Sequence, residues 1–237
     1  MEYEIIKERE HFHRIENGGV RAFLFEGTDK AMLVDTGFGN IPMKKIVSEL
    51  TALPVFVVNT HADRDHIGCN GEFSDIYMHK AEKERYIQNL PAGCSPEKLI
   101  ALSDGDIIDL GIWKFEVIFT PGHTSGSIML FEREKRMLIS GDSIQNGMMY
   151  MFGKGRNVPA LIGSLEKIAA MSKDIETIYP SHADCPLTPD IIPFVSDGAK
   201  ALLEGKLKPE DPPFSVPARL YTAENISFLY NEEEAEL

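Results

Sequence analysis

Four consecutive apolar residues, Val55 to Val58, place the strongest constraint on the fold of this 237-residue chain. A short run of this kind, rich in β-branched residues, predicts a strand that is buried on both faces. Strands of that type belong mostly to sheets whose two faces are covered by helices. The run therefore predicts an α/β protein, and a chain of this length can bury a substantial core without the help of disulfides.

Segments rich in β-forming residues surround this strand, with glycine, proline and asparagine turns between them. Further strands are predicted over Tyr3 to Lys7, Phe12 to Glu16, Val20 to Glu26, Lys30 to Asp35, Ile76 to Met78, Phe115 to Phe119, Ser127 to Glu132, Arg136 to Ser140, Ile175 to Tyr179 and Ile226 to Leu229. Helices are predicted over Pro42 to Leu50, Lys80 to Gln88, Val158 to Ser172 and Pro189 to Leu203. The segment from Pro91 to Asp106 contains two prolines and two glycines and is predicted to be a surface excursion.

The order of these elements is twofold, because strands are followed by a helix in each half of the chain. This order suits two sheets packed face to face with helices outside, which is a layered α/β architecture. No short tandem repeat interrupts it, so we expect one domain that spans residues 1–237.

The formal net charge of −13 at pH 7 limits the classes of partner. Phosphate backbones bind Lys and Arg, so a small-molecule substrate is expected rather than nucleic acid or a membrane surface, with a homodimer as an open alternative. Three cysteines without a C-x-x-C pair predict reduced thiols. The acidic N-terminus leads into no apolar signal segment, and a cytoplasmic location is the expectation.

Seven imidazole and carboxylate side chains follow apolar, strand-like runs, and they are the strongest functional signal in the chain. They are His61, Asp63, Asp65, His66, His123, Asp142 and His182. Strand ends can bring residues that are distant in sequence to one rim of a sheet. Imidazole and carboxylate together suit zinc, manganese or iron, and seven ligands exceed the need of one tetrahedral ion. They are enough for two ions that hold a hydroxide between them and polarise a scissile carbonyl.

The ordered motifs, from Asp35-Thr36-Gly37 to His182, resemble the metallo-β-lactamase superfamily, in its glyoxalase II-like or lactonase-like branch. The resemblance implies a four-layer αβ/βα sandwich of two mixed sheets with the metals at one edge. It implies that one ion is bound by His61, Asp63 and His123 and the other by Asp65, His66 and His182, with Asp142 as the bridge. It also implies that Asp65 orients the nucleophilic water and that Asp35 supports the site without ligating.

One position departs from the family pattern His-x-His-x-Asp-His, because Asp63 stands where the second histidine is expected. With three ionised carboxylates, a hydroxide would complete the neutralisation of two divalent ions. The site is therefore expected to be a weaker Lewis acid and more tolerant of harder metals. Two ions are expected, zinc first and manganese or iron as alternatives. The other outcome is that Asp63 fails to reach the metal and leaves one site weak or empty.

The leading functional hypothesis is a metal-dependent hydrolase that cleaves an ester, thioester, lactone or amide in a small molecule through a metal-bound hydroxide. Two hypotheses from other classes stay open. One is a di-iron redox module of the flavodiiron type, which carboxylate-rich ligation favours. The other is a binding domain whose metal site is impaired by Asp63.

A segment rich in methionine and aromatic residues follows Asp142 and is a candidate wall of the substrate pocket. It includes Met149, Tyr150 and Phe152, and methionine adapts to irregular shapes. Arg156 comes next and could meet a substrate carboxylate or phosphate. The alternatives are that the segment belongs to the core and that Arg156 is only solvated. Near the first cluster, His79 is expected to be a strand-end histidine, and Cys69 a small buried thiol.

Overall fold

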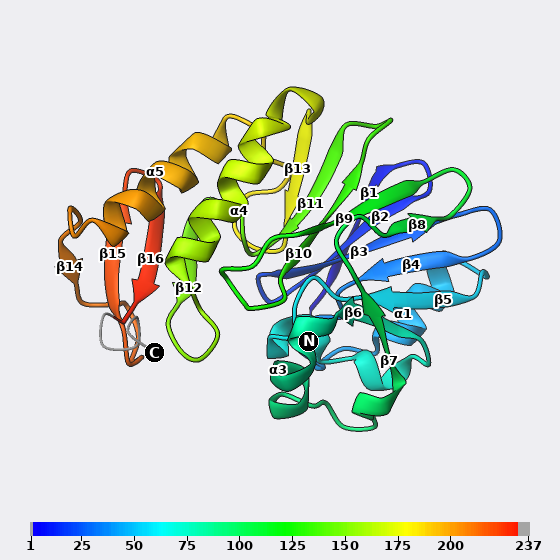
Figure 1. Cartoon of the computed structure of the whole chain (residues 1–237). Helices are drawn as coiled ribbons and strands as arrows, with labels where there is room; N and C mark the ends of the chain where they lie inside the picture. The colour runs from blue at the N-terminus through cyan, green and yellow to red at the C-terminus, as the bar shows by residue number, and fades with distance from the viewer. Residues whose placement is uncertain (1, 232–237) are drawn as a thin grey trace. The chain divides into compact units, whose positions relative to one another are not determined.

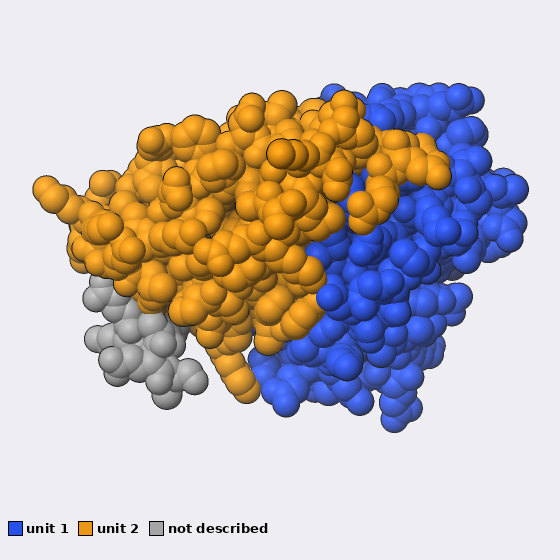
Figure 2. Space-filling model, turned by 45° about the horizontal axis from the view of Figure 1, so that its top comes forward, with its two compact units in different colours: residues 1–118, 130–132 blue, residues 119–129, 133–237 orange. Residues whose placement is uncertain are grey.

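A computed structural model describes residues 2–231, and the chain forms two compact units (Figure 1 and Figure 2). Unit 1 runs to Ile118 and includes Leu130–Glu132, whereas unit 2 comprises Phe119–Met129 and the chain from Arg133 onward. Each unit is compact in itself, so the expectation of a single domain stays a prediction. Within residues 2–231, no helix combines the length and the apolar character that crossing a membrane requires.

Unit 1 is built on a seven-stranded sheet in the order β1-β2-β3-β4-β5-β6-β7. These strands are β1 (Glu4–Arg9), β2 (Phe12–Asn17), β3 (Val20–Glu26), β4 (Ala31–Val34), β5 (Val55–Val58), β6 (Ile76–His79) and β7 (Leu99–Leu102). The first four are antiparallel neighbours, whereas β4 to β7 run parallel to one another. The carboxyl ends of parallel strands lie at one edge of a sheet, and loops at that edge are where α/β proteins usually place their sites.

Side chains from both faces of this sheet form the core of unit 1. The helices are α1 (Met43–Leu50), α2 (Arg64–Ile67) and α3 (Lys83–Gln88), with short 3-10 turns η1 (Asn70–Glu72), η2 (Lys80–Glu82) and η3 (Pro96–Lys98). Helix α1 packs its apolar side, including Ile46, against Leu24 and Leu33. On β3 the next residue, Phe25, stacks on Phe12 with ring centroids 4.3 Å apart. Successive residues of a strand point to opposite faces, so β3 is buried on both sides.

Strands β8 (Ile107–Asp109) and β9 (Lys114–Phe119) form an antiparallel pair near the end of unit 1. Trp113 lies between them, and its ring meets that of Phe25 nearly edge-on at 5.2 Å. The indole N–H donates to the Glu26 carbonyl at 3.1 Å. The aromatic group therefore fixes this pair against β3 by packing and by a satisfied polar contact.

Unit 2 contains parallel strands β11 (Met137–Gly141) and β13 (Thr177–Pro180), and a separate sheet in the order β12-β16-β15-β14. The members of that sheet are β12 (Gly147–Met151), β16 (Ile226–Tyr230), β15 (Arg219–Ala223) and β14 (Pro209–Glu210). The helices are α4 (Val158–Ala170) and α5 (Ile191–Leu203), with the turn η4 (Ser172–Asp174). Figure 1 shows α4 and α5 side by side, and α5 also packs on β15 and β16.

Most of the predicted elements are confirmed within one or two residues, including Val20–Glu26 and Val55–Val58. The predicted helix from Lys80 is divided into the turn η2 and the helix α3. The predicted surface excursion from Pro91 to Asp106 is wrong over Leu99–Leu102, which forms β7 beside β6. Strand β10 (Ile128–Glu132) agrees with its prediction, whereas β8, β12, β14 and β15 have no predicted counterpart.

Candidate metal site

The N-terminal ligand cluster consists of His61, Asp63, Asp65 and His66, which lie in unit 1 in the loop and the short helix α2 that follow β5. The loop leaves the carboxyl end of β5, next to the end of the parallel strand β4. The two imidazoles are almost completely buried, and their ring centroids lie 3.9 Å apart. The sequence cluster is therefore also a cluster in space.

Each imidazole of this cluster has a carboxylate oxygen beside its Nε2 atom. The Nε2 of His61 lies 3.5 Å from Oδ2 of Asp63, and the Nε2 of His66 lies 3.6 Å from Oδ2 of Asp65. Two donors bound at typical zinc distances to one tetrahedral ion lie about 3.4 Å apart. The chemistry and spacing of these donors thus fit the binding of a divalent metal ion.

Asp35 orients His61 and His66 so that their Nε2 atoms are available to bind a metal ion. Its Oδ2 accepts hydrogen bonds from Nδ1 of His66 at 2.8 Å and from the hydroxyl of Thr60 at 2.7 Å. Because the Thr60 hydroxyl donates to Asp35, it accepts from Nδ1 of His61 at 3.0 Å. Both imidazoles therefore carry their proton on Nδ1 and present the Nε2 lone pair, as metal-bound histidines with a carboxylate partner do.

Asp35 is itself held by backbone and side-chain donors after β4. It is completely buried and has a positive φ of 60°, a conformation that aspartate tolerates better than most residues. Its Oδ1 accepts from the Thr60 N–H at 2.8 Å and from the amide of Asn59 at 3.4 Å. The same Asn59 amide donates to the His66 carbonyl at 3.0 Å. Asp35 thus supports the cluster from behind, as the family resemblance implies.

Arg85, on α3, is the residue of this region that the sequence analysis does not single out. Its Nε forms an ion pair and a hydrogen bond with Oδ1 of Asp63, while Oδ2 of Asp63 is the atom beside His61. Both side chains are mostly buried, with 19% of Arg85 and 15% of Asp63 exposed. Asp63, the residue that departs from the family pattern, therefore has a cationic partner in Arg85.

The C-terminal ligand cluster consists of His123, Asp142 and His182, which all lie in unit 2. Asp142 directly follows β11 and His182 follows β13 by two residues, and these strands are parallel neighbours. Oδ2 of Asp142 lies 3.4 Å from Nε2 of His123 and 3.4 Å from Nε2 of His182. One carboxylate oxygen between two imidazoles has the position of a ligand that two ions could share.

The loop that carries His123 is braced by the segment before α4. Nη1 of Arg156 donates to the His123 carbonyl, and the Asn157 N–H donates to the Gly122 carbonyl at 2.8 Å. The hydroxyl of Ser164 donates to the Pro121 carbonyl at 2.7 Å. Arg156, a candidate for contact with a substrate in the sequence analysis, thus stabilises this loop.

Gly122 allows α4 to approach this loop, and its replacement by alanine is expected to displace His123. The residue has a φ of 143°, and a Cβ atom there would lie 2.4 Å from the backbone N and Cα of Leu161. We expect Gly122→Ala to lower the free energy of unfolding by about 2–3 kcal/mol, the scale of a strained or overpacked position. Thermal unfolding followed by circular dichroism measures this loss. Gly153→Ala is the control, because φ is also positive there at 90° but nothing lies within 4 Å of the added Cβ, and an equal loss in both variants would contradict the steric account.

The predicted pocket wall on β12 alternates between the interior and the surface of unit 2. Met149 is 1% exposed and belongs to the core, which favours the alternative interpretation for this residue. Tyr150 is 41% exposed, and its ring lies 6.0 Å from that of Phe152 and 6.3 Å from that of Phe214. A strand alternates its side chains, so Tyr150 and Phe152, unlike Met149, are candidates for contact with a ligand.

His79 and Cys69 have the structural roles that the sequence analysis favours. His79 ends β6, and its Nδ1 accepts from the Ala81 N–H at 3.3 Å. Burial lowers the pKa of His79, so its neutral form is favoured. Cys69 is 3% exposed, and its thiol donates to the Ile41 carbonyl at 3.3 Å.

The Cys69 thiol is expected to be unreactive in the folded protein. Burial, followed by the nearby Glu72 carboxylate, raises the pKa of this thiol to about 11. At pH 8 roughly one thiol in a thousand would then be ionised, and the thiolate is the reactive form. In a Cys94→Ser/Cys185→Ser variant, a disulfide reagent at pH 8 should modify Cys69 only after unfolding in guanidinium. Rapid modification of the folded variant would contradict this.

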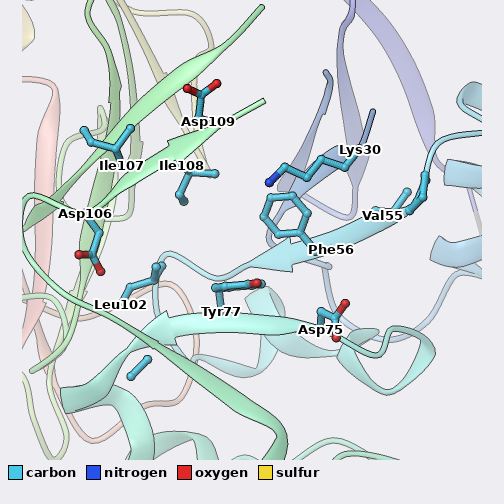
Figure 3. A pocket seen from close by; sticks show the side chains of 12 residues that line it. Lys30, Val55, Phe56, Asp75, Tyr77, Leu102, Asp106, Ile107, Ile108 and Asp109 are labelled. Atoms are coloured by element: carbon cyan, nitrogen blue, oxygen red, sulfur yellow. The ribbon is translucent and has the colours of Figure 1, made fainter. Parts of the chain in front are cut away.

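A cavity of about 520 Å³ in unit 1 lies among β5, β6 and β8 (Figure 3). The rings of Phe56 and Tyr77 face it, with centroids 5.3 Å apart, and Nζ of Lys30 lies 5.6 Å from the centre of the Phe56 ring. Asp106 and Asp109 are at its margin. None of the residues of either ligand cluster lines this cavity, so it is distinct from the candidate metal site.

Comparisons with known proteins agree with these observations. The model of the metallo-beta-lactamase superfamily matches residues 15–182, which span both ligand clusters. An acyl-coenzyme A thioesterase, MBLAC2 of Bos taurus, is 25% identical over 210 residues, which cover 71% of this chain and 75% of the relative. A hydroxyacylglutathione hydrolase of Francisella tularensis is 28% identical over 169 residues, which cover 70% of this chain and 64% of the relative.

Among solved structures, a metallo-beta-lactamase from Pontibacter korlensis superposes with a TM-score of 0.69 at 14% identity. The match covers 84% of this chain and 99% of that chain, and it confirms the predicted α/β fold class. The family match, which extends over more than half of the chain, settles the membership that the motifs indicate. This chain belongs to the metallo-beta-lactamase superfamily and is a metallo-hydrolase of that superfamily.

Proposed function

We propose that this chain is a thioester hydrolase in which the seven residues of the two ligand clusters bind two divalent metal ions. The proposal rests on one distance, between an imidazole nitrogen and a carboxylate oxygen, that recurs at four histidines. Each of four imidazole Nε2 atoms lies 3.4–3.6 Å from a carboxylate oxygen of its own cluster. Zinc suits this donor set first, with manganese or iron as alternatives. When bound, the ions supply Lewis acidity toward a water molecule and a substrate carbonyl.

The residues of the chain have separate parts in this proposal. Asp142 would serve as a ligand common to both ions, since its Oδ2 is equally distant from Nε2 of His123 and Nε2 of His182. Asp35 fixes His66, and through Thr60 it also fixes His61. Asp65 orients the attacking water and accepts its proton, a role open to a carboxylate that is 24% exposed and beside the buried His66.

A thioester is favoured over an amide by the chemistry of the leaving group. A thiol has a pKa near 8.5, so a thiolate can leave without being protonated first, whereas an amine cannot. A thioester therefore needs no general acid besides the groups described above. The two curated relatives bear names that denote hydrolases of acylated thiols, which supports the same class of substrate.

The test is a panel of acyl-coenzyme A and S-acylglutathione thioesters, a simple aryl ester, a lactone and an amide, assayed with the metal-replete full chain. We expect the largest kcat/KM for a thioester, measured from the thiol released. Removal of metal with a chelator should abolish turnover, and zinc or manganese should restore it. The Asp65→Asn variant should keep its fold but lose at least about a hundredfold in kcat, because it loses a proposed metal ligand together with the general base.

Other outcomes of this assay separate the competing hypotheses. Turnover of the lactone or the ester alone would keep the metallo-hydrolase and reject the thioester. A metal-loaded protein that hydrolyses nothing but consumes oxygen with an electron donor would support a di-iron redox module instead. A chain that hydrolyses nothing and holds less than one metal equivalent would support a binding domain.

A further inference from the structure

Three residues in and next to α3 hold the loop that carries Asp63. Arg85 lies in α3, Glu82 ends the turn η2 directly before it, and Asn89 directly follows it. Oε2 of Glu82 accepts from the Ala62 N–H at 2.8 Å, and the Asn89 amide donates to the Ala62 carbonyl at 2.9 Å. Glu82 and Ala62 are both completely buried. The residues that flank α3 thus fix the backbone next to Asp63 through both of its polar groups.

Arg85 lies between these two anchors and forms its ion pair with Asp63. The two oxygens of Asp63 have different neighbours: Oδ1 is beside Nε of Arg85, and Oδ2 is 3.5 Å from Nε2 of His61. Asp63 therefore has one oxygen toward a cation of the protein and the other toward a candidate ligand. The guanidinium of an arginine in such a pair stays charged.

We propose that Arg85 is a positioning residue that compensates the negative charge of Asp63. The pair then takes the place of the second histidine of the family pattern without a net charge. The pair of Asp63 and Arg85 has no net charge, as a neutral imidazole has none. The charge that the aspartate adds to the metal site is therefore cancelled next to the site. This rests on the proposed metal-binding function and explains how a carboxylate can occupy this position without adding a full negative charge to the ligand set.

The proposal makes opposite predictions for the two members of the pair. Arg85→Met removes the cation and keeps a side chain of similar length, so the uncompensated Asp63 should attract a divalent ion more strongly. Asp63→Asn removes the carboxylate charge that offsets Arg85 beside the site, so the ion should be repelled. Unit charges a few ångströms apart at a half-buried site interact strongly enough for at least a tenfold change in either direction. The double variant restores neutrality and should therefore bind the ion more tightly than Asp63→Asn alone.

The experiment measures dissociation constants for Zn²⁺ by competition with a chromophoric chelator at fixed pH and ionic strength. It uses the full chain and the variants Arg85→Met, Asp63→Asn, Asp63→Asn/Arg85→Met and Lys83→Met. Lys83 is an exposed cation at the start of α3, so Lys83→Met controls for loss of a positive charge from the same helix. We expect tighter binding for Arg85→Met, weaker binding for Asp63→Asn, and values within about twofold of the wild type for Lys83→Met.

An Arg85→Met variant that keeps the fold of the wild type and binds Zn²⁺ as the wild type does, or more weakly, would overturn the proposal. Circular dichroism spectra and melting temperatures of the metal-free variants show whether weaker binding comes from a disrupted loop. In that case the Arg85→Lys variant, which keeps the positive charge, decides. If Arg85→Lys binds Zn²⁺ as tightly as Arg85→Met or more tightly, charge compensation is rejected. If Arg85→Lys binds Zn²⁺ at least tenfold more weakly than Arg85→Met, charge compensation is supported. A wild-type chain that binds no Zn²⁺ would reject the proposed metal site itself, a result distinct from an unchanged Arg85→Met variant.

Discussion

The Asp142→Ala variant is expected to lose most of its bound metal and at least a hundredfold of its hydrolytic activity. Asp142 is 9% exposed, and its Oδ2 lies 3.4 Å from Nε2 of both His123 and His182. Loss of a residue that only supports a metal ligand already costs about 10–100-fold in affinity or activity. Loss of a ligand that two ions share should cost more. Elemental analysis and the thioester assay measure the two effects.

Asp184→Asn is the matched control for this variant. Asp184 is an exposed aspartate two residues after His182, and its Oδ2 accepts a hydrogen bond from the Asn146 amide at 2.7 Å. Its metal content and its activity should stay close to those of the wild type. Asp142→Ala protein that keeps two equivalents of metal would remove Asp142 from the proposed ligand set.

The Asp35→Asn variant is expected to bind metal about 10–100-fold more weakly, although Asp35 is not a proposed ligand. Its amide would place a donor where the carboxylate accepts from Nδ1 of His66 and from the Thr60 hydroxyl. The imidazole would then lose the partner that sets its proton on Nδ1. A buried group left without its hydrogen bond costs about 1–3 kcal/mol, so the free energy of unfolding of the metal-free protein should fall by a similar amount.

Chelator competition and chemical unfolding of the metal-free protein measure the two effects of Asp35→Asn separately. Asp29→Asn, at an exposed position before β4, controls for the removal of a carboxylate from unit 1. If Asp35→Asn lowers stability but leaves the Zn²⁺ dissociation constant unchanged, Asp35 only stabilises the fold. That result would contradict its role in orienting His66.

The positions of the candidate ligands could be predicted because each follows an apolar strand. The runs before His61 and Asp142 became β5 and β11, as their composition indicates. The role of Arg85 could not be predicted in this way, since it is 22 residues from Asp63 and meets it only through the packing of α3. Its spacing from Glu82 and Asn89 is a helical signal, but an exposed helix face has the same pattern.

The strands that have no predicted counterpart are short and depend on their neighbours in the sheet. Strand β7 follows prolines and a glycine, and only its pairing with β6 makes it a strand. Strand β14 has two residues and exists as the partner of β15. The pairing of β12 with β16 fixes the register in which Met149 is buried and Tyr150 is exposed. Local sequence does not contain these pairings.

Metal content after metal-replete expression tests the central claim most directly. The full chain is purified without chelator, passed over a desalting column and measured by elemental analysis, with Asp142→Ala measured beside it. We predict close to two equivalents of divalent metal per wild-type chain, with zinc as the main element, and less than one equivalent in Asp142→Ala. A correctly folded wild-type chain with less than one-tenth of an equivalent would contradict the account.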